Sequence, residues 1–366
     1  MICYLRTSAA SFDIRLQKYI LACQQSNTPY IAITWDRLMH NKQLSLHEIQ
    51  FKHYAPYGLE HRLHNFFLYI RWSFFALFNL IKLRKNYTII HACNLETIVV
   101  AFILKLLFRK KIIFDIYDTS GKYRLERFFA KRANLFILPH DLRAQQIGLP
   151  NTLKNLFVVE NVPYFNNYKP NYKHPSCDGD LHISYVGTFQ RNIRGIENLI
   201  RLTEAHKNIF CDIAGSGDGL EKDIIQASKR CARIKYHGTL MYDEALDLMA
   251  KSDIMYACYY LIARTHKYAS PNKYYESLFL GKPLITSKNT LVGKRVEDGN
   301  TGYTIGDSYE DLEKLISTLS AGTSESFFSE KGLNAIMIWK NTYANYFDQR
   351  IKGEYINHCV EISKHA

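Results

Sequence analysis

The feature that most constrains the fold of this chain is a repeated alternation of short apolar segments with longer helical patterns. In the first half, strand-like runs recur at 2–7, 30–35, 49–55, 88–92, 111–117, 135–139 and 156–160. Helical patterns separate most of them, at 12–24, 60–84, 95–108 and 122–132. Short apolar strands that alternate with helices are typical of a parallel sheet covered on both faces. The first half therefore predicts one doubly wound α/β domain.

A polar stretch at 164–180 interrupts the alternation. It contains two prolines and no apolar periodicity, so we expect a linker between domains. Beyond it, strands are expected at 182–187, 210–215, 233–238, 253–258 and 284–286, with helices at 195–206, 220–230, 242–251 and from 270. The sequence thus predicts two doubly wound domains, at 1–165 and 178–344, with a C-terminal helix at about 345–366 that packs back on the first.

The charge and the cysteines limit the classes of function. The 366 residues carry a net charge of +13, which favours anionic partners such as nucleic acid, acidic lipid or a phosphorylated substrate. No block of consecutive Lys and Arg dominates, so a nucleic-acid-binding tail is not indicated. The eight cysteines form no C-x-x-C pair and have no histidine at zinc spacing, which favours reduced thiols in the cytosol. The start, "MICYLRTS", has no signal-peptide pattern and is expected to be the first strand.

The segment 65–86, "NFFLYIRWSFFALFNLIKLRKN", is apolar, aromatic and basic at its end. Arg71 and Asn79 interrupt it, whereas a membrane-spanning helix needs about 20 mostly uncharged residues. We therefore expect a long amphipathic helix whose apolar face lies in the core or on an anionic membrane surface. If that face is core, disrupting Trp72 or Phe75 should unfold the protein.

The stretch 270–287, "SPNKYYESLFLGKPLITS", predicts a short helix followed by a buried strand. Ser270 suits the N-cap, Pro271 the first helical position and Gly281 the C-terminal exit. Lys273 lies in the first turn, where the helix dipole disfavours a cation, so Lys273→Glu should slightly stabilise a purely structural helix. A bound phosphate would explain the lysine, because helix N-termini bind anions through free N–H groups.

Four stretches of the second half, 185–200, 212–224, 234–257 and 270–287, follow predicted strands. Each alone has a structural interpretation, since arginines in turns are commonly solvated and glycines after strands commonly serve the turn. The run "GSGDG" also differs from the dinucleotide pattern G-x-G-x-x-G. Together they lie at the carboxyl edge of one predicted sheet, where doubly wound domains bind their ligands.

The order and spacing of these segments, with "VEDGNTGY" further on, resemble retaining glycosyltransferases of the GT-B fold. The resemblance is strongest to family four, which contains bacterial surface-polysaccharide enzymes. It covers most of the second half, whereas the first half matches through "SFDIR", "IIHACNLET", "FDIYDTSGKY" and "VVENVP". It implies two Rossmann-like domains that face each other across a cleft, the first binding an acceptor and the second a nucleotide sugar.

In such enzymes, a helix N-terminus and one or two basic side chains hold the diphosphate. The resemblance implies that Lys273 and Arg194, assisted by Arg191, supply those charges here. It also implies that Glu276 accepts hydrogen bonds from both ribose hydroxyls, which suits the two oxygens of a carboxylate. The remaining donor-side candidates are Gly187, Gly215, Gly217, His237, Gly238, Thr239, Leu240, Ser270, Pro271 and Asn272.

Among these candidates, residues 237–240 would lie near the base and residues 270–272 would face the phosphates. No metal and no cofactor is expected besides the nucleotide sugar itself, because a helix dipole and cations stabilise the leaving diphosphate.

Two positions depart from the family. Tyr268 occupies the place of the first of two paired glutamates, and Tyr117 occupies the place of a histidine in the acceptor domain. Both family residues usually contact the transferred sugar, so its identity stays open. The candidate replacements are Asp118 and His91, which is expected at the end of the neighbouring strand. A structural role for His91 is the favoured alternative. The catalytic candidates are Tyr117, Asp118, Arg194 and Lys273, and the acceptor-side candidates are Asp13, Arg15 and His91.

The sequence thus predicts a cytoplasmic enzyme, peripheral at the inner face of the membrane, that acts in O-antigen, capsule or exopolysaccharide biosynthesis. It would transfer a sugar from a nucleotide diphosphate to a lipid-linked or polysaccharide acceptor with retention. Three alternatives stay open: a GT-B epimerase, which needs acid and base carboxylates, a non-catalytic nucleotide-sugar-binding homologue, and a nucleic-acid binder. A nucleic-acid binder should gather its basic residues on one outer face.

Overall fold

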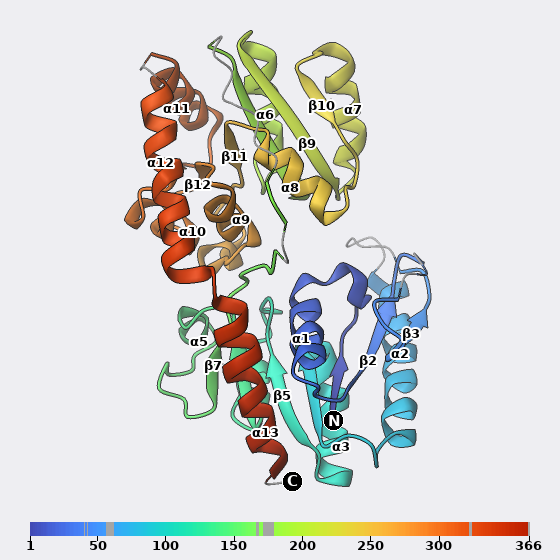
Figure 1. The fold of residues 1–366 in the computed structure, drawn as a ribbon. Helices are drawn as coiled ribbons and strands as arrows, with labels where there is room; N and C mark the ends of the chain where they lie inside the picture. Colours follow the sequence, from blue (N-terminus) through green and yellow to red (C-terminus); the bar gives the residue numbers. More distant parts are fainter. Residues whose placement is uncertain are drawn as a thin grey trace. The chain divides into compact units, whose positions relative to one another are not determined.

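The computed structural model describes residues 1–39, 41, 43–55, 62–165, 168–170, 179–321 and 324–364. The chain forms two compact units, one made of Met1–Tyr164 with Asn345–Ala366 and one of Phe165–Ala344 (Figure 1). Much of the expected linker 164–180, including Cys177, lies outside the described residues. The seven cysteines in the described part of the chain are free and buried.

The first unit contains a parallel sheet in the order β3-β2-β1-β4-β5-β6-β7. Its strands are β1 (Ile2–Leu5), β2 (Tyr30–Asp36), β3 (Glu48–Lys52), β4 (Ile89–Cys93), β5 (Lys111–Asp115), β6 (Leu135–Leu138) and β7 (Leu156–Val158). Every residue of β1 and β4 is buried, as expected of strands covered on both faces.

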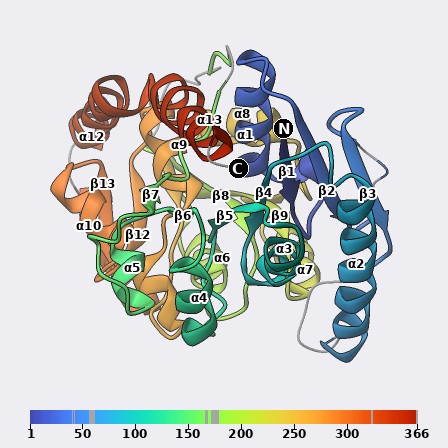
Figure 2. The same ribbon diagram turned by 90° about the horizontal axis from the view of Figure 1, so that it is seen from below.

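Alternate residues of β1 enter different cores, because successive side chains of a strand point to opposite faces. Ile2 and Tyr4 pack with α1 (Ile14–Gln25) and with the C-terminal elements η5 (Phe347–Tyr355) and α13 (Ile356–Lys364). Cys3 and Leu5 belong to the other core, which includes residues of α2 (Arg62–Lys82), α3 (Leu95–Phe108) and α4 (Tyr123–Ala130) (Figure 2). The short elements η1 (Ala10–Phe12) and α5 (Leu142–Gln146) complete the unit.

The second unit contains a parallel sheet in the order β10-β9-β8-β11-β12-β13. Its strands are β8 (Leu181–Thr188), β9 (Ile209–Ser216), β10 (Ile234–Tyr236), β11 (Ile254–Tyr256), β12 (Leu284–Ser287) and β13 (Gly302–Ile305). Its helices are α6 (Ile196–Ala205), α7 (Leu220–Arg230), α8 (Tyr242–Ala250), η3 (Arg264–Tyr268), α9 (Asn272–Leu280), α10 (Leu291–Asp298), α11 (Tyr309–Ala321), α12 (Ser324–Ile338) and the π-helical η4 (Trp339–Tyr343).

The predicted fold class, two doubly wound parallel α/β sheets, is confirmed. Three details differ from the sequence analysis. Pro271, not Ser270, is the N-cap of α9, which begins at Asn272, and His91 lies in the middle of β4 rather than at its end. Strand β13 was not expected, because its sequence, GYTI, contains Gly and Thr and so does not form a continuous apolar run. Within the described ranges, no helix has the length and apolarity that crossing a membrane requires.

Candidate functional site

The order of the second sheet reverses between β8 and β11, and doubly wound sheets bind ligands at such a point. Helix α9 connects β11 to the parallel strand β12, so its N-terminus must lie at the carboxyl edge of the sheet. Arg194 follows β8 and Tyr259 follows β11, and the Arg194 guanidinium carbon lies 4.4 Å from the centre of the Tyr259 ring. This contact joins the two loops at the switch point.

The glycines at the carboxyl ends of β8 and β9 allow two backbones to approach closely. A Cβ on Gly215 (φ +135°) would lie 1.8 Å from the Gly187 carbonyl oxygen. A Cβ on Gly217 (φ +143°) would lie 2.4 Å from the Phe189 carbonyl oxygen. Packing therefore explains why these two positions are glycine, and their contact with a ligand stays a prediction.

The two arginines of the first loop differ in their partners. Arg191 pairs with Asp223 at 2.6 Å, and both side chains are about half exposed. Arg194 donates its Nε–H to the Gln190 side-chain oxygen at 2.9 Å, and no ion pair of Arg194 occurs in the part of the chain that the structure describes. Arg194 thus keeps its charge available to an anion, whereas Arg191 already has a carboxylate partner at the surface.

Lys273 has a partner within its own helix. Its ammonium group pairs with Oε2 of Glu276, whose side chain is only 1% exposed. The hydroxyl of Tyr242, at the start of α8, donates to the other carboxylate oxygen at 3.1 Å. Burial, and then the adjacent carboxylate, raises the pKa of Tyr242 well above its usual value, so this hydroxyl stays a donor. Each carboxylate oxygen of Glu276, which we expected to accept from the ribose hydroxyls, therefore already has a partner within the protein.

The predicted base-binding segment, residues 237–240, lies in the loop that follows β10. His237 Nε2 lies 2.6 Å from the Asp212 carboxylate on the neighbouring strand β9. Gly238 is left-handed (φ +68°), and its carbonyl accepts the N–H of Gly215 at 2.8 Å. Thr239 is exposed and Leu240 is half-buried, so an edge of this segment is open to solvent.

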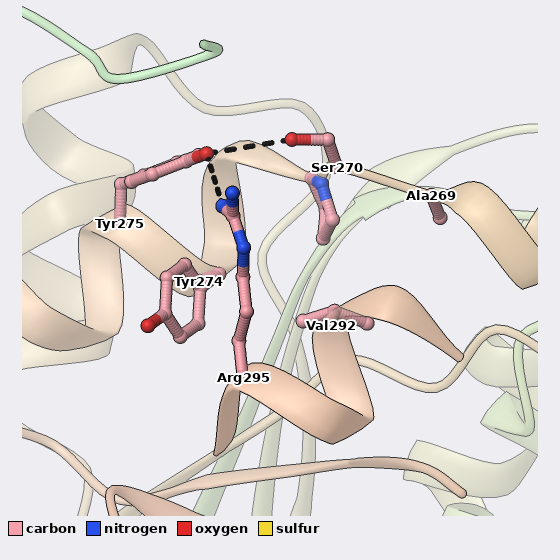
Figure 3. A pocket seen from close by; sticks show the side chains of 7 residues that line it. Ala269, Ser270, Tyr274, Tyr275, Val292 and Arg295 are labelled. Carbon is pink, nitrogen blue, oxygen red and sulfur yellow. Dashed lines mark hydrogen bonds between the residues drawn. The ribbon is translucent and has the colours of Figure 1, made fainter. Parts of the chain in front are cut away.

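A hollow lies on the α10 side of α9, away from the Lys273–Glu276 pair. It is lined by Ala269, Ser270, Pro271, Tyr274, Tyr275, Val292 and Arg295 (Figure 3). Arg295 donates to the Tyr275 hydroxyl at 2.7 Å, and that hydroxyl lies 3.4 Å from the Ser270 hydroxyl (Figure 3). Neither Arg295 nor Tyr242 was recognisable from the sequence, since neither belongs to a local phosphate or sugar motif. By contrast, Lys273 and Glu276 lie three residues apart in a predicted helix, and this spacing is typical of an ion pair on one helix face.

The acceptor-side candidates in the first unit are mostly buried. Asp13 accepts the Leu16 N–H as the N-cap of α1 and pairs with Arg6. Arg15 donates to both oxygens of Asp115, at 2.8 and 3.0 Å. His91 is fully buried, and its Nδ1 lies 2.8 Å from the Tyr355 hydroxyl. These contacts give the three candidates structural partners and leave little surface for an acceptor.

The catalytic candidates of this unit lie after β5. Tyr117 is 9% exposed, its hydroxyl donates to the Cys93 sulfur at 3.3 Å, and Arg6 lies 4.3 Å above its ring. The Asp118 side chain is 87% exposed and lies 3.1 Å from Arg143. Asp118 is therefore the more accessible of the two.

Three comparisons with known proteins bear on this site. Residues 180–321 match the family model described as "Glycosyl transferases group 1", which covers less than half of the chain. Among curated proteins, none matches.

Solved structures match over nearly the whole chain. Anabaena HepE in complex with UDP-glucose is 17% identical with a TM-score of 0.66, covering 100% of this chain and 98% of that one. Sucrose-phosphate synthase from Thermosynechococcus elongatus is 13% identical with a TM-score of 0.75, covering 100% and 99%. WaaG, a glycosyltransferase involved in lipopolysaccharide biosynthesis, is 12% identical with a TM-score of 0.64, covering 96% and 98%.

The resemblance to GT-B glycosyltransferases is thereby confirmed: the chain has their fold. Its second unit matches the group 1 glycosyltransferases over residues 180–321. These findings support glycosyl transfer from a nucleotide sugar. Membership of family four, retention and the roles of single residues stay predictions.

Proposed function

We propose that this protein is a retaining glycosyltransferase that moves a sugar from a nucleotide diphosphate to a lipid-linked or polysaccharide acceptor in surface-glycan biosynthesis. One observation carries the proposal: Arg194 and the N-terminus of α9 flank the switch point of the unit that matches the glycosyltransferase family. Two of the similar structures support it, since HepE was solved with UDP-glucose and WaaG is involved in lipopolysaccharide biosynthesis.

In the proposed donor complex, the diphosphate lies against the N-terminal end of α9. Arg194 and Lys273 contribute positive charge, and together with the helix dipole they stabilise the diphosphate as it leaves. These charges do the work that a metal does in other transferases, so we propose metal-independent turnover.

Binding of the donor then requires a rearrangement of the α9 ion pair. The Glu276 side chain is only 1% exposed, so a ribose can reach its carboxylate only if one of its two partners moves, and Lys273 is the partner at the surface. A phosphate beside the first turn of α9 attracts the Lys273 ammonium group and so favours that movement. Phosphate binding and ribose binding are therefore coupled through one lysine.

Retention fits a front-face reaction. The bond from the anomeric carbon to the diphosphate breaks as the acceptor oxygen approaches the same face, and the leaving phosphate oxygen takes the acceptor's proton. Such a reaction needs no strong protein base, which agrees with the burial of Tyr117 and of His91 in the first unit.

A non-catalytic nucleotide-sugar-binding homologue is the second candidate. It is favoured by Tyr117, which replaces the family's histidine and lies buried, and by Tyr268, which replaces a glutamate. Donor binding without sugar transfer or donor hydrolysis would distinguish it from the enzyme.

Calorimetric titration with UDP, GDP and ADP tests the donor site. We expect one of them to bind, and Arg194→Ala to weaken its binding by about tenfold or more, since a charge-assisted contact to phosphate is lost. Arg230→Ala is the control, because Arg230 is an exposed arginine at the far end of α7 that pairs with Glu204. Equal losses in both variants, or no binding of any nucleotide, would contradict this placement of the site.

A further inference from the structure

Helix α2 is apolar on two opposite faces. Leu68, Trp72, Ala76 and Leu80 are buried in the core, and the exposed fractions of these side chains do not exceed 6%. The opposite face carries Leu63, Phe66, Phe67, Phe74 and Phe78, which are 57–78% exposed. These positions lie three, four or seven residues apart and so form one stripe along the helix. A surface helix normally has polar residues there, so the outer face of α2 needs an explanation.

The exposed apolar surface continues onto the neighbouring helices. Helix α2 packs against α3, and α3 packs against α4 (Figure 2). Their exposed apolar side chains are Val99, Ile103, Leu106, Leu107, Phe108, Leu125 and Phe128. An aromatic side chain covers about 150–250 Å² when buried, so the four phenylalanines of α2 alone expose roughly 500 Å². That already reaches the upper range of apolar patches on monomeric proteins, and such patches commonly mark interaction sites.

The charge around this patch has one sign. Residues 62–111 contain nine Lys and Arg and a single acidic residue, Glu96. Lys82, Arg84 and Lys85 are exposed at the C-terminal end of α2. The ammonium group of Lys110, beyond α3, donates to the backbone carbonyls of Arg84 and Tyr87, which leaves its charge uncompensated. A partner for this surface should therefore offer an apolar region to the exposed phenylalanines and negative charge to the basic side chains beside them.

We propose that the outer face of α2, with the adjoining faces of α3 and α4, docks on an anionic lipid bilayer. Phe66, Phe67, Phe74 and Phe78 enter the interface, and the basic cluster Lys82, Arg84, Lys85 and Lys110 lies against the headgroups. A second copy of the chain fits less well, because two such basic clusters would repel each other. This inference does not depend on the donor site, and it would bring the first unit to a lipid-linked acceptor.

The structure separates the docking role of α2 from its structural role. Trp72 is fully buried and Phe75 is half-buried against the core, so their replacement would disturb folding. Phe74→Ser/Phe78→Ser changes only exposed side chains that lie one helical turn apart. The matched control is Leu333→Ser/Met337→Ser on α12, which also changes two residues with i, i+4 spacing, 61% and 58% exposed.

Flotation with vesicles of equal parts phosphatidylglycerol and phosphatidylcholine tests the proposal. We expect the full chain to bind these vesicles at low salt, to bind pure phosphatidylcholine weakly, and to dissociate at high salt, since exposed charge attraction is screened. Phe74→Ser/Phe78→Ser should weaken binding by about tenfold or more, whereas Leu333→Ser/Met337→Ser should leave it unchanged. Replacing Lys82, Arg84 and Lys85 by Gln should weaken binding to the anionic vesicles alone.

Any of three flotation results would overturn the proposal. The chain could fail to bind anionic vesicles at low salt, the phenylalanine variant could bind as well as the parent chain, or both double variants could lose binding equally. Sedimentation that shows a dimer dissociated by Phe74→Ser/Phe78→Ser would assign the patch to a second copy instead. Nucleotide binding by the phenylalanine variant should equal that of the parent chain, so the membrane surface and the donor site are tested separately.

Discussion

Replacement of Lys273 separates two descriptions of helix α9. The helix dipole alone favours an acidic residue in the first turn, so Lys273→Glu would stabilise the unliganded protein by a few tenths of a kcal/mol. The structure predicts the opposite change in stability, because Lys273 pairs with a Glu276 side chain that is only 1% exposed. Lys273→Glu places a second carboxylate beside a buried one, and we expect the variant to be destabilised.

The magnitude follows from the burial of the two partners. Removing one partner of a buried ion pair costs about 3–5 kcal/mol. The lower end applies here, because the Lys273 side chain is 17% exposed and Tyr242 still donates to Glu276 in the variant. The dipole offsets less than about 1 kcal/mol of this. A net loss of about 2–3 kcal/mol corresponds to a decrease of roughly 4–12 °C in the melting temperature of a domain of this size.

Thermal and urea unfolding of four variants measures the effect: Lys273→Glu, Lys273→Met, Glu276→Gln and the double Lys273→Met/Glu276→Gln. The double variant should be more stable than Lys273→Met, because a neutral Gln needs no cation and still accepts a hydrogen bond from Tyr242. We expect a coupling energy of about 1–2 kcal/mol from this cycle. A Lys273→Glu variant as stable as the parent chain, or more stable, would refute the ion-pair explanation and restore the dipole as the dominant effect.

Three further predictions concern ligands and pH. Glu276→Ala should weaken nucleoside diphosphate binding, whereas inorganic pyrophosphate binding should not weaken, because the variant keeps Arg194 and the helix N-terminus and releases Lys273 from its ion pair; calorimetry in which both fall together would contradict the ribose role. Turnover should persist in EDTA, since the proposed charges of Arg194 and Lys273 replace a metal; activity lost in EDTA and restored by magnesium would contradict this. Burial alone would raise the pKa of Asp115, but the Arg15 guanidinium outweighs it and holds the pKa at about 2, below the usual 3.8. The ionised Asp115 therefore contributes on the order of 2 kcal/mol to the free energy of unfolding above pH 3.8, and this contribution is lost as the pH falls toward 2. The stability of Asp115→Asn should depend less on pH in this range than that of the parent chain. An unchanged pH dependence would exclude Asp115 as the cause.

Local patterns in the sequence were sufficient for the type of each long element and for the fold class. Buried strands such as β4 and β12 show as short apolar runs, and Gly281 marks the end of α9 because glycine adopts the left-handed conformation there (φ +62°) without strain. These signals depend on neighbours within one turn or one strand, so they can be read without the rest of the chain. The cations Arg194 and Lys273 were recognisable for the same reason, since they lie at the ends of local strand–loop–helix patterns.

The partners of these side chains, however, are decided by tertiary structure. Glu276 receives a hydrogen bond from Tyr242, and Arg15 meets Asp115 a hundred residues away, because the sheet order brings their elements together. The two faces of α2 are equally apolar in sequence, and only packing decides that Trp72 is core while Phe74 and Phe78 are exposed. Apolar periodicity indicates which residues are hydrophobic along one face of a helix. The topology of the sheet determines which of these residues pack against other elements and which stay exposed. The uncovered face is the part of this molecule that the sequence alone did not distinguish from its core.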